Sequence, residues 1–151
     1  MRLFFYSFIM MLLPGSAQLS TDTSIIEVTN AWISESPPSV RVNAAYMLIK
    51  NTSDQDIVLN KVESPDFERV EMHRSKIRED TAHMELQGQL EITANSQLHF
   101  KPGDYHLMLF NPARSMRVGA MSTLILYLSG GRQIEVDVIV KKLNLEQSHK
   151  H

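Results

Sequence analysis

The stretch TLILYLSGGRQIEVDVIVKK, residues 123–142, decides the fold of this chain. Leucine occupies every second position up to Leu128, and Ile or Val alternates with acidic residues after Gln133. This alternation places apolar side chains on one face of a β-strand and the other side chains on the opposite face. Gly130 and Gly131 stand between the two runs and can adopt the positive φ angles of a tight turn. The stretch predicts a β-hairpin.

Similar short runs rich in Val, Ile, Leu and Tyr occur before this hairpin, and turn residues such as Pro37, Pro65 and Gly103 separate them. The predicted strands are Ile25–Ile33, Ala44–Lys50, Ile57–Glu63, Arg69–Ser75, Met84–Gln87, Leu90–Thr93, Gln97–Phe100, Tyr105–Phe110, Thr123–Leu128 and Gln133–Lys142. No run of ten residues after position 17 keeps a helical period. Short strands at this spacing are typical of a single all-β sandwich or barrel.

The composition bounds the class of protein. Charged residues make up 21% of the 151 residues and hydrophobic residues 43%, which is an ordinary globular mixture. The net charge of -2 gives no electrostatic reason to expect nucleic acid or an anionic membrane surface as a partner. The chain has no cysteine, which excludes thiolate sites such as Cys-ligated zinc, iron–sulfur clusters and blue copper.

The first 17 residues have the pattern of a signal peptide. A positive start at Arg2 precedes the apolar run Leu3–Leu13, and small residues end at Ala17. A run of 11 residues is shorter than the roughly 20 needed to span a bilayer as a helix. We expect residues 1–17 to be removed and the mature protein to lie in the periplasm, with no cysteine at the cleavage point to carry lipid. An uncleaved anchor or a buried first helix is the alternative.

A candidate metal site begins in the run Tyr-His-Leu-Met-Leu-Phe at residues 105–110. Strand alternation puts His106 and Met108 on one face, and Leu107 and Leu109 on the face with the better claim to the core. An imidazole beside a thioether is a soft, neutral ligand pair, which suits Cu(I) far better than Mg, Ca or Mn.

Two residues upstream extend this pair. His73 lies on the predicted strand Arg69–Ser75, and Met84 follows after ten intervening residues. Twenty-one more residues separate Met84 from His106, so the full pattern is H-x10-M-x21-H-x-M.

This pattern resembles the copper-binding motif of the periplasmic copper chaperones called PCuAC, and the four residues fall on it without gap or insertion. The resemblance covers nearly the whole mature chain. It includes Asn30-Ala31-Trp32, Pro37-Pro38, Ala44-Ala45-Tyr46, Asn51, Val70-Glu71-Met72-His73, the run KPGDYHLML at residues 101–109, and Gly130-Gly131.

The resemblance implies a cupredoxin-like Greek-key β-sandwich over residues 18–145. It further implies one Cu(I) ion at an exposed edge site formed by His73, Met84, His106 and Met108. Proteins of this family pass copper toward the copper-bearing subunit of cytochrome c oxidase, directly or with a thioredoxin-like copper chaperone.

The other His and Met residues have simpler interpretations. Met47, Met116 and Met121 are expected to fill the core, because methionine is a flexible apolar side chain. Alternation sends His83 to the face opposite Met84, and His99 alternates with apolar residues, so both are expected to face solvent as bystanders. The flexible tail at residues 146–151 contains His149 and His151, which either chelate Cu(II) or belong to a solvated terminus.

Three other functions compete with the chaperone. An electron-transfer cupredoxin needs a Cys ligand that the chain lacks. An exported β-sandwich interaction module without metal remains as an alternative. We do not expect an enzyme, since no carboxylate pair, nucleophile–base arrangement or Gly-rich phosphate loop is evident.

Overall fold

The computed structural model describes residues 25–79 and 81–143. The predicted signal peptide and the tail at residues 146–151 lie outside these ranges. Within them, the strands are β1 (Ile26–Ser34), β2 (Val42–Asn51), β3 (Ile57–Glu63), β4 (Phe67–Arg78), β5 (Thr81–Gln87), β6 (Leu90–Ile92), β7 (Gln97–Phe100), β8 (Tyr105–Pro112), β9 (Met121–Leu128) and β10 (Gln133–Lys141), with a 3-10 turn η1 (Ser129–Gly131). All ten predicted strands are confirmed, with ends shifted by up to three residues. No helix in the described ranges is long and apolar enough to cross a membrane.

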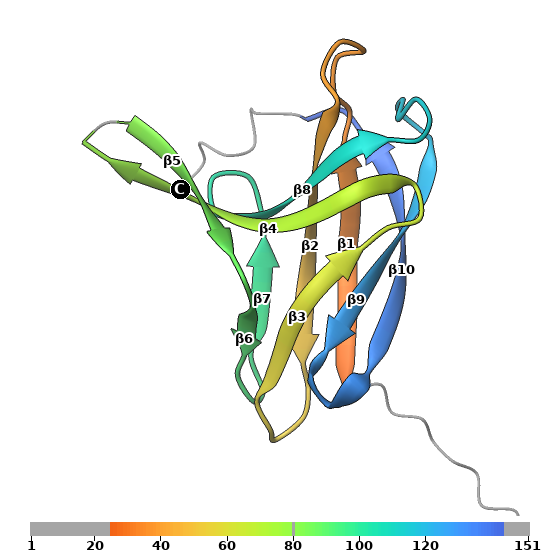
Figure 1. The fold of residues 1–151 in the computed structure, drawn as a ribbon. Helices are drawn as coiled ribbons and strands as arrows, with labels where there is room; N and C mark the ends of the chain where they lie inside the picture. The colour runs from red at the N-terminus through yellow and green to blue at the C-terminus, as the bar shows by residue number, and fades with distance from the viewer. Residues whose placement is uncertain (1–24, 80, 144–151) are drawn as a thin grey trace, which may run out of the picture.

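The strands form one hydrogen-bonded ladder in the order β5-β4-β8-β7-β2-β1-β10-β9-β3-β6, and β8 also pairs with β2. Strand β1 pairs with β10 in parallel, whereas most other neighbours are antiparallel. The ladder curls so that its two halves enclose one apolar core (Figure 1). The fully buried apolar side chains come from both halves: Ile33, Ile49, Leu59, Ile92, Leu107, Leu109, Leu124, Leu126, Val138 and Val140.

The hairpin that decides the fold is β9–η1–β10. Gly130 and Gly131 have φ angles of 76° and 75°, the left-handed region in which a side chain would be strained. Leu124 and Leu126 are fully buried on β9, while Asp137 on β10 is exposed, as the alternation predicts. Full burial of one such leucine contributes about 1.5–3 kcal/mol, so the pattern fixes which face of the hairpin meets the core.

Asn51 at the end of β2 joins the β2–β3 loop to the β6–β7 loop from a fully buried position. Its Nδ2 donates to the carbonyl oxygens of Gln55, Ile92 and Thr93 at 2.7, 3.0 and 3.2 Å. Its Oδ1 accepts from the backbone N–H and the hydroxyl of Ser53 at 3.0 and 2.7 Å. A buried amide with these partners satisfies backbone groups that the strands leave unpaired.

Strand β4 leaves the core part-way along its length. Its first half covers the core with Phe67 and Met72, which are buried. Beyond them, β4 and β5 form a hairpin that projects from the body of the sandwich (Figure 1). Ile77, Met84 and Leu86 on this hairpin are exposed. The predicted site therefore lies where the body ends and the hairpin begins.

Candidate metal centre

Two histidines lie side by side on β4 and β8. The antiparallel register pairs His73 directly with His106, and their rings are nearly stacked, with centroids 6.0 Å apart and planes at 27°. Both are largely hidden from solvent: the His73 side chain is 13% exposed and His106 is 6% exposed. Leu107 and Leu109 on the opposite face of β8 are fully buried, so the predicted division of faces is confirmed.

The Glu71 carboxylate sets the tautomer of His73. The Nε2 of His73 lies 2.9 Å from Oε2 of Glu71. An ionised carboxylate only accepts hydrogen bonds, so Nε2 carries the proton of the neutral ring and Nδ1 carries its lone pair. Nδ1 is buried and has no hydrogen-bond partner among the described residues. A buried polar atom without a partner is costly, and a metal ion bound there would remove that cost.

The backbone sets the tautomer of His106. Its Nδ1 lies 2.9 Å from the carbonyl oxygen of Asp104, so Nδ1 carries the proton and Nε2 carries the lone pair. The same carbonyl accepts the backbone N–H of Ser75 at 3.1 Å. A tight turn places it: Asp104 N–H donates to the Lys101 carbonyl at 3.2 Å, with Gly103 at φ 82°. The two histidines thus present opposite ring nitrogens.

Glu71 is itself held in the ionised form. Arg69 Nε lies 2.7 Å from its Oε1, and the Arg69 guanidinium stacks 4.2 Å over the Phe110 ring. The hydrogen bond from His73, reinforced by the Arg69 charge, keeps the pKa of Glu71 below its ordinary value against the opposing effect of burial. A carboxylate that hydrogen-bonds a metal-binding histidine orients the ring and increases its basicity.

The two thioethers approach the histidine pair from opposite sides. Met108 lies across from Glu71 on the β4–β8 ladder, and Met84 lies across from Ser75 on the β4–β5 ladder. Each is therefore a diagonal neighbour of His73 on the same face of the sheet. Diagonal neighbours are about 7–8 Å apart, which long side chains can bridge. Met108 is partly buried, whereas Met84 is 62% exposed and must turn from solvent to reach His73.

Comparison with known proteins supplies the family. A family model described as "Putative lipoprotein LpqE-like" matches residues 26–140. The chain belongs to the LpqE-like family. It is 27% identical over 131 residues to "Putative lipoprotein Lxx21020" of Leifsonia xyli subsp. xyli (strain CTCB07), a match that covers 85% of this chain and 78% of that protein.

Solved structures show the same fold as this LpqE-like chain. The copper-bound PCuAC domain from PmoF2 superimposes with a TM-score of 0.67 at 20% identity, covering 79% of this chain and 94% of that one. Apo-DR1885 from Deinococcus radiodurans gives a TM-score of 0.63 at 27% identity and covers 97% of both chains. CuI-DR1885 gives 0.61 at 27% identity, covering 84% of this chain and 83% of that one. The predicted resemblance to PCuAC proteins and the cupredoxin-like β fold are confirmed.

The expected exposed edge site differs from the structure in one respect. In the LpqE-like chain His106 is buried and His73 is partly buried. Both lie on interior strands of the ladder, β8 and β4, whereas β5 forms its edge. Only Met84, on β5, matches the expected exposure. The role of Glu71 was not foreseen from the sequence, although Glu-x-His on a strand places both side chains on one face.

The remaining His and Met residues divide as follows. Met47 and Met116 are buried in the core as predicted, but Met121 is 51% exposed, so the core assignment is wrong there: it opens β9 with its side chain toward solvent. His83 lies across from Lys76, on the face opposite Met84, and His99 is exposed, as expected. His149 and His151 lie outside the described residues.

Within residues 25–79 and 81–143, no three or more His, Cys, Asp or Glu side chains come together as a group that could hold a metal. Met108 lies across from Glu71, on the same face of the sheet as the two histidines, and is partly buried.

Proposed function

We propose that this protein is an exported copper chaperone that binds one Cu(I) ion through His73, His106, Met108 and Met84. The observation that carries the proposal is the buried Nδ1 of His73, which has no hydrogen-bond partner among the described residues, on a ring whose centroid lies 6.0 Å from that of a second fixed histidine. The similarity to a copper-bound PCuAC domain and to CuI-DR1885 supports the choice of metal.

The chemistry of these side chains favours the monovalent ion. Two neutral imidazoles and two thioethers add no charge to offset that of a metal, and soft sulfur ligands select Cu(I) over harder divalent ions. Thioethers also persist in an oxidising compartment, where the exposed Met84 is open only to sulfoxide formation.

The histidines and Met84 have different roles in this proposal: the histidines hold the metal, and Met84 releases it first. Glu71 and the Asp104 carbonyl fix the two rings, so His73 and His106 lose little freedom when they bind the ion. Met84 stands on the exposed hairpin and is the ligand most accessible to a recipient. We infer that a recipient's ligand replaces Met84 first, before the less exposed histidines release the ion.

The location and the recipient follow from the resemblance. The signal peptide at residues 1–17 supports export to the periplasm, and the 151 residues contain no cysteine that could carry the lipid of a lipoprotein. The recipient is the copper centre of cytochrome c oxidase, reached directly or through a thioredoxin-like chaperone. The protein acts as a carrier rather than an enzyme.

The proposal is tested by anaerobic Cu(I) titration of the chain from Gln18 onward, against a competing chelator. One equivalent of colourless Cu(I) is expected to bind, and binding is lost when His106 and Met108 are both changed to alanine. Met121→Ala is the matched control, because Met121 is an exposed methionine on another strand. Substoichiometric binding, or unchanged binding in the double variant, contradicts the proposal.

A further inference from the structure

We propose that two copies of this chain pair through the free edge of β5, antiparallel and centred on Met84. This inference concerns an interface between copies and does not depend on copper. It is drawn from the direction of the backbone groups on β5, the order of its side chains and the exposure of its apolar face.

The free edge of β5 presents unpaired backbone groups. In the described ladder, β5 is the terminal strand and pairs only with β4. The backbone N–H of Ser75 donates to Asp104 beside β8, so Ser75 turns its backbone groups away from β5. Its partner Met84 therefore sits in a non-hydrogen-bonded pair and points its own N–H and C=O outward. Ala82 and Leu86 share this direction, because backbone direction repeats every second residue.

The order of side chains on β5 fits a second copy of the same strand. When Met84 pairs with itself, Ala82 of each copy faces Leu86 of the other, and Thr81 faces Gln87. His83 of each copy then lies across from Glu85 of the other copy, so the interface contains two such pairs. Each pair places a ring N–H opposite a carboxylate. A shift of the centre by one residue sets Glu85 against Glu85 or His83 against His83. Like charges directly opposite are destabilising, so the register centred on Met84 is favoured.

One face of the hairpin is apolar and exposed. Ile77, Met84 and Leu86 are 80%, 62% and 64% exposed, although large apolar side chains favour burial. No Lys or Pro interrupts β5, the residues that commonly protect a free edge from pairing.

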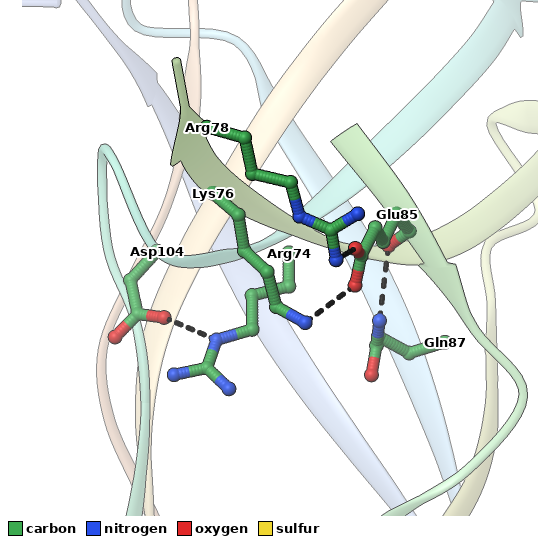
Figure 2. Close-up of polar contacts among 6 residues, drawn as sticks. All are labelled: Arg74, Lys76, Arg78, Glu85, Gln87 and Asp104. Atoms are coloured by element: carbon green, nitrogen blue, oxygen red, sulfur yellow. Dashed lines mark hydrogen bonds and ion pairs between the residues drawn. The ribbon is translucent and has the colours of Figure 1, made fainter. Parts of the chain in front are cut away.

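Ion pairs on the opposite face hold the hairpin in this shape (Figure 2). Glu85 accepts from Lys76 at 2.6 Å and from Arg78 at 2.7 Å, and Arg74 donates to Asp104 at 3.0 Å. Gln87 adds a hydrogen bond to the Glu85 carbonyl at 3.1 Å. These contacts join β4 to β5 and to the turn before β8, so the edge of β5 is ordered before a second copy arrives.

The geometry of the pairing leaves room for both bodies. Strand β5 joins the body at Gln87 and begins at the outer end of the projecting hairpin, at Thr81 (Figure 1). Antiparallel pairing therefore puts the two bodies at opposite ends. The dyad of an antiparallel pair is perpendicular to the sheet, so both His73 side chains lie on one face, with the two Met84 side chains adjacent between them. Each copy then contributes a thioether beside the other copy's exposed ligand.

A single cysteine tests the register, since the chain has no cysteine of its own. In metal-free protein with chelator, Met84→Cys is expected to form a disulfide-linked dimer under mild oxidation. Paired residues on antiparallel strands are within the Cα separation that a disulfide needs. Met121→Cys and His83→Cys are the controls, and both are expected to stay largely monomeric. Equal crosslinking of all three variants overturns the proposal, because it reports random collision.

Sedimentation of the protein without engineered cysteines tests the association itself. The wild-type chain is expected to form a dimer as its concentration rises toward about 1 mM, the range of weak association. Ala82→Pro removes an outward N–H without removing a β4–β5 hydrogen bond, and should stay monomeric with an unchanged melting temperature. His83→Glu should weaken association at least tenfold, because the new carboxylate faces Glu85 of the second copy. This variant tests the interface independently if the proline variant does not fold. A monomeric wild type, or unchanged association in His83→Glu, overturns the proposal and leaves the copper titration unaffected.

Discussion

Replacing Glu71 by alanine should weaken Cu(I) binding without removing any ligand. Glu71 Oε2 accepts the Nε2–H of His73 at 2.9 Å, which leaves Nδ1 as the metal-binding nitrogen. Without the carboxylate, the ring can protonate either nitrogen and can rotate. Loss of such a supporting hydrogen bond typically lowers metal affinity about 10–100-fold, or about 1.4–2.7 kcal/mol. Glu71→Gln keeps an acceptor but loses the charge, so its affinity should lie between those of Glu71→Ala and the wild type.

Two assays separate the orientation of the ring from the binding of the metal. Long-range nitrogen–proton NMR of the metal-free protein should show His73 protonated on Nε2 in the wild type and a mixture of tautomers in Glu71→Ala. Competition with a Cu(I) chelator then gives the change in affinity. Glu68→Ala is the control, because Glu68 lies on the same strand and contacts Asn111 rather than a histidine. An unchanged affinity in Glu71→Ala, together with a changed tautomer, refutes the argument that this carboxylate prepares the site.

Further substitutions test other parts of the account. Met108→Ala should lower Cu(I) affinity on the order of 100-fold in chelator competition. The basis is the binding free energy of structural four-ligand Zn²⁺ sites, about 10–16 kcal/mol, which corresponds to about 3 kcal/mol for each ligand. Met84→Ala should cost less, because this side chain is mostly in solvent; a larger loss than for Met108→Ala contradicts the division of roles. Asn51→Ala should lower the free energy of unfolding in urea by about 2–4 kcal/mol, because it leaves the carbonyl groups of Ile92 and Thr93 without this hydrogen-bond donor. A loss below about 1 kcal/mol contradicts this role of Asn51. Truncation after Leu145 should remove one equivalent of Cu(II) and leave Cu(I) binding intact; unchanged Cu(II) stoichiometry removes the second site.

The strands could be predicted from the sequence because burial on a sheet is a local, period-two property. Leu107 and Leu109 had to face the core, and this alone placed His106 and Met108 together on the other face. The same reasoning failed at Met121, where an apolar residue at the start of a strand faces solvent. Alternation tells which residues share a face, but it does not tell how much of that face other elements cover.

The pairing of strands could not be predicted in this way, because it joins residues far apart in the chain. The sequence places His73 and His106 on separate strands, and only the register puts them opposite each other. The order of strands also decides that the histidines are interior and Met84 is at the edge. The contacts that fix the ring tautomers, from Glu71 and the Asp104 carbonyl, depend on backbone geometry that composition and spacing do not contain.

The measurement that tests the copper site most directly is X-ray absorption on the protein loaded with one equivalent of Cu(I). Two sulfur and two nitrogen neighbours are expected in the wild type, with one sulfur lost in Met108→Ala and none lost in Met121→Ala. A metal surrounded only by nitrogen and oxygen would remove both methionines from the site and leave a cupredoxin-like fold without the proposed function.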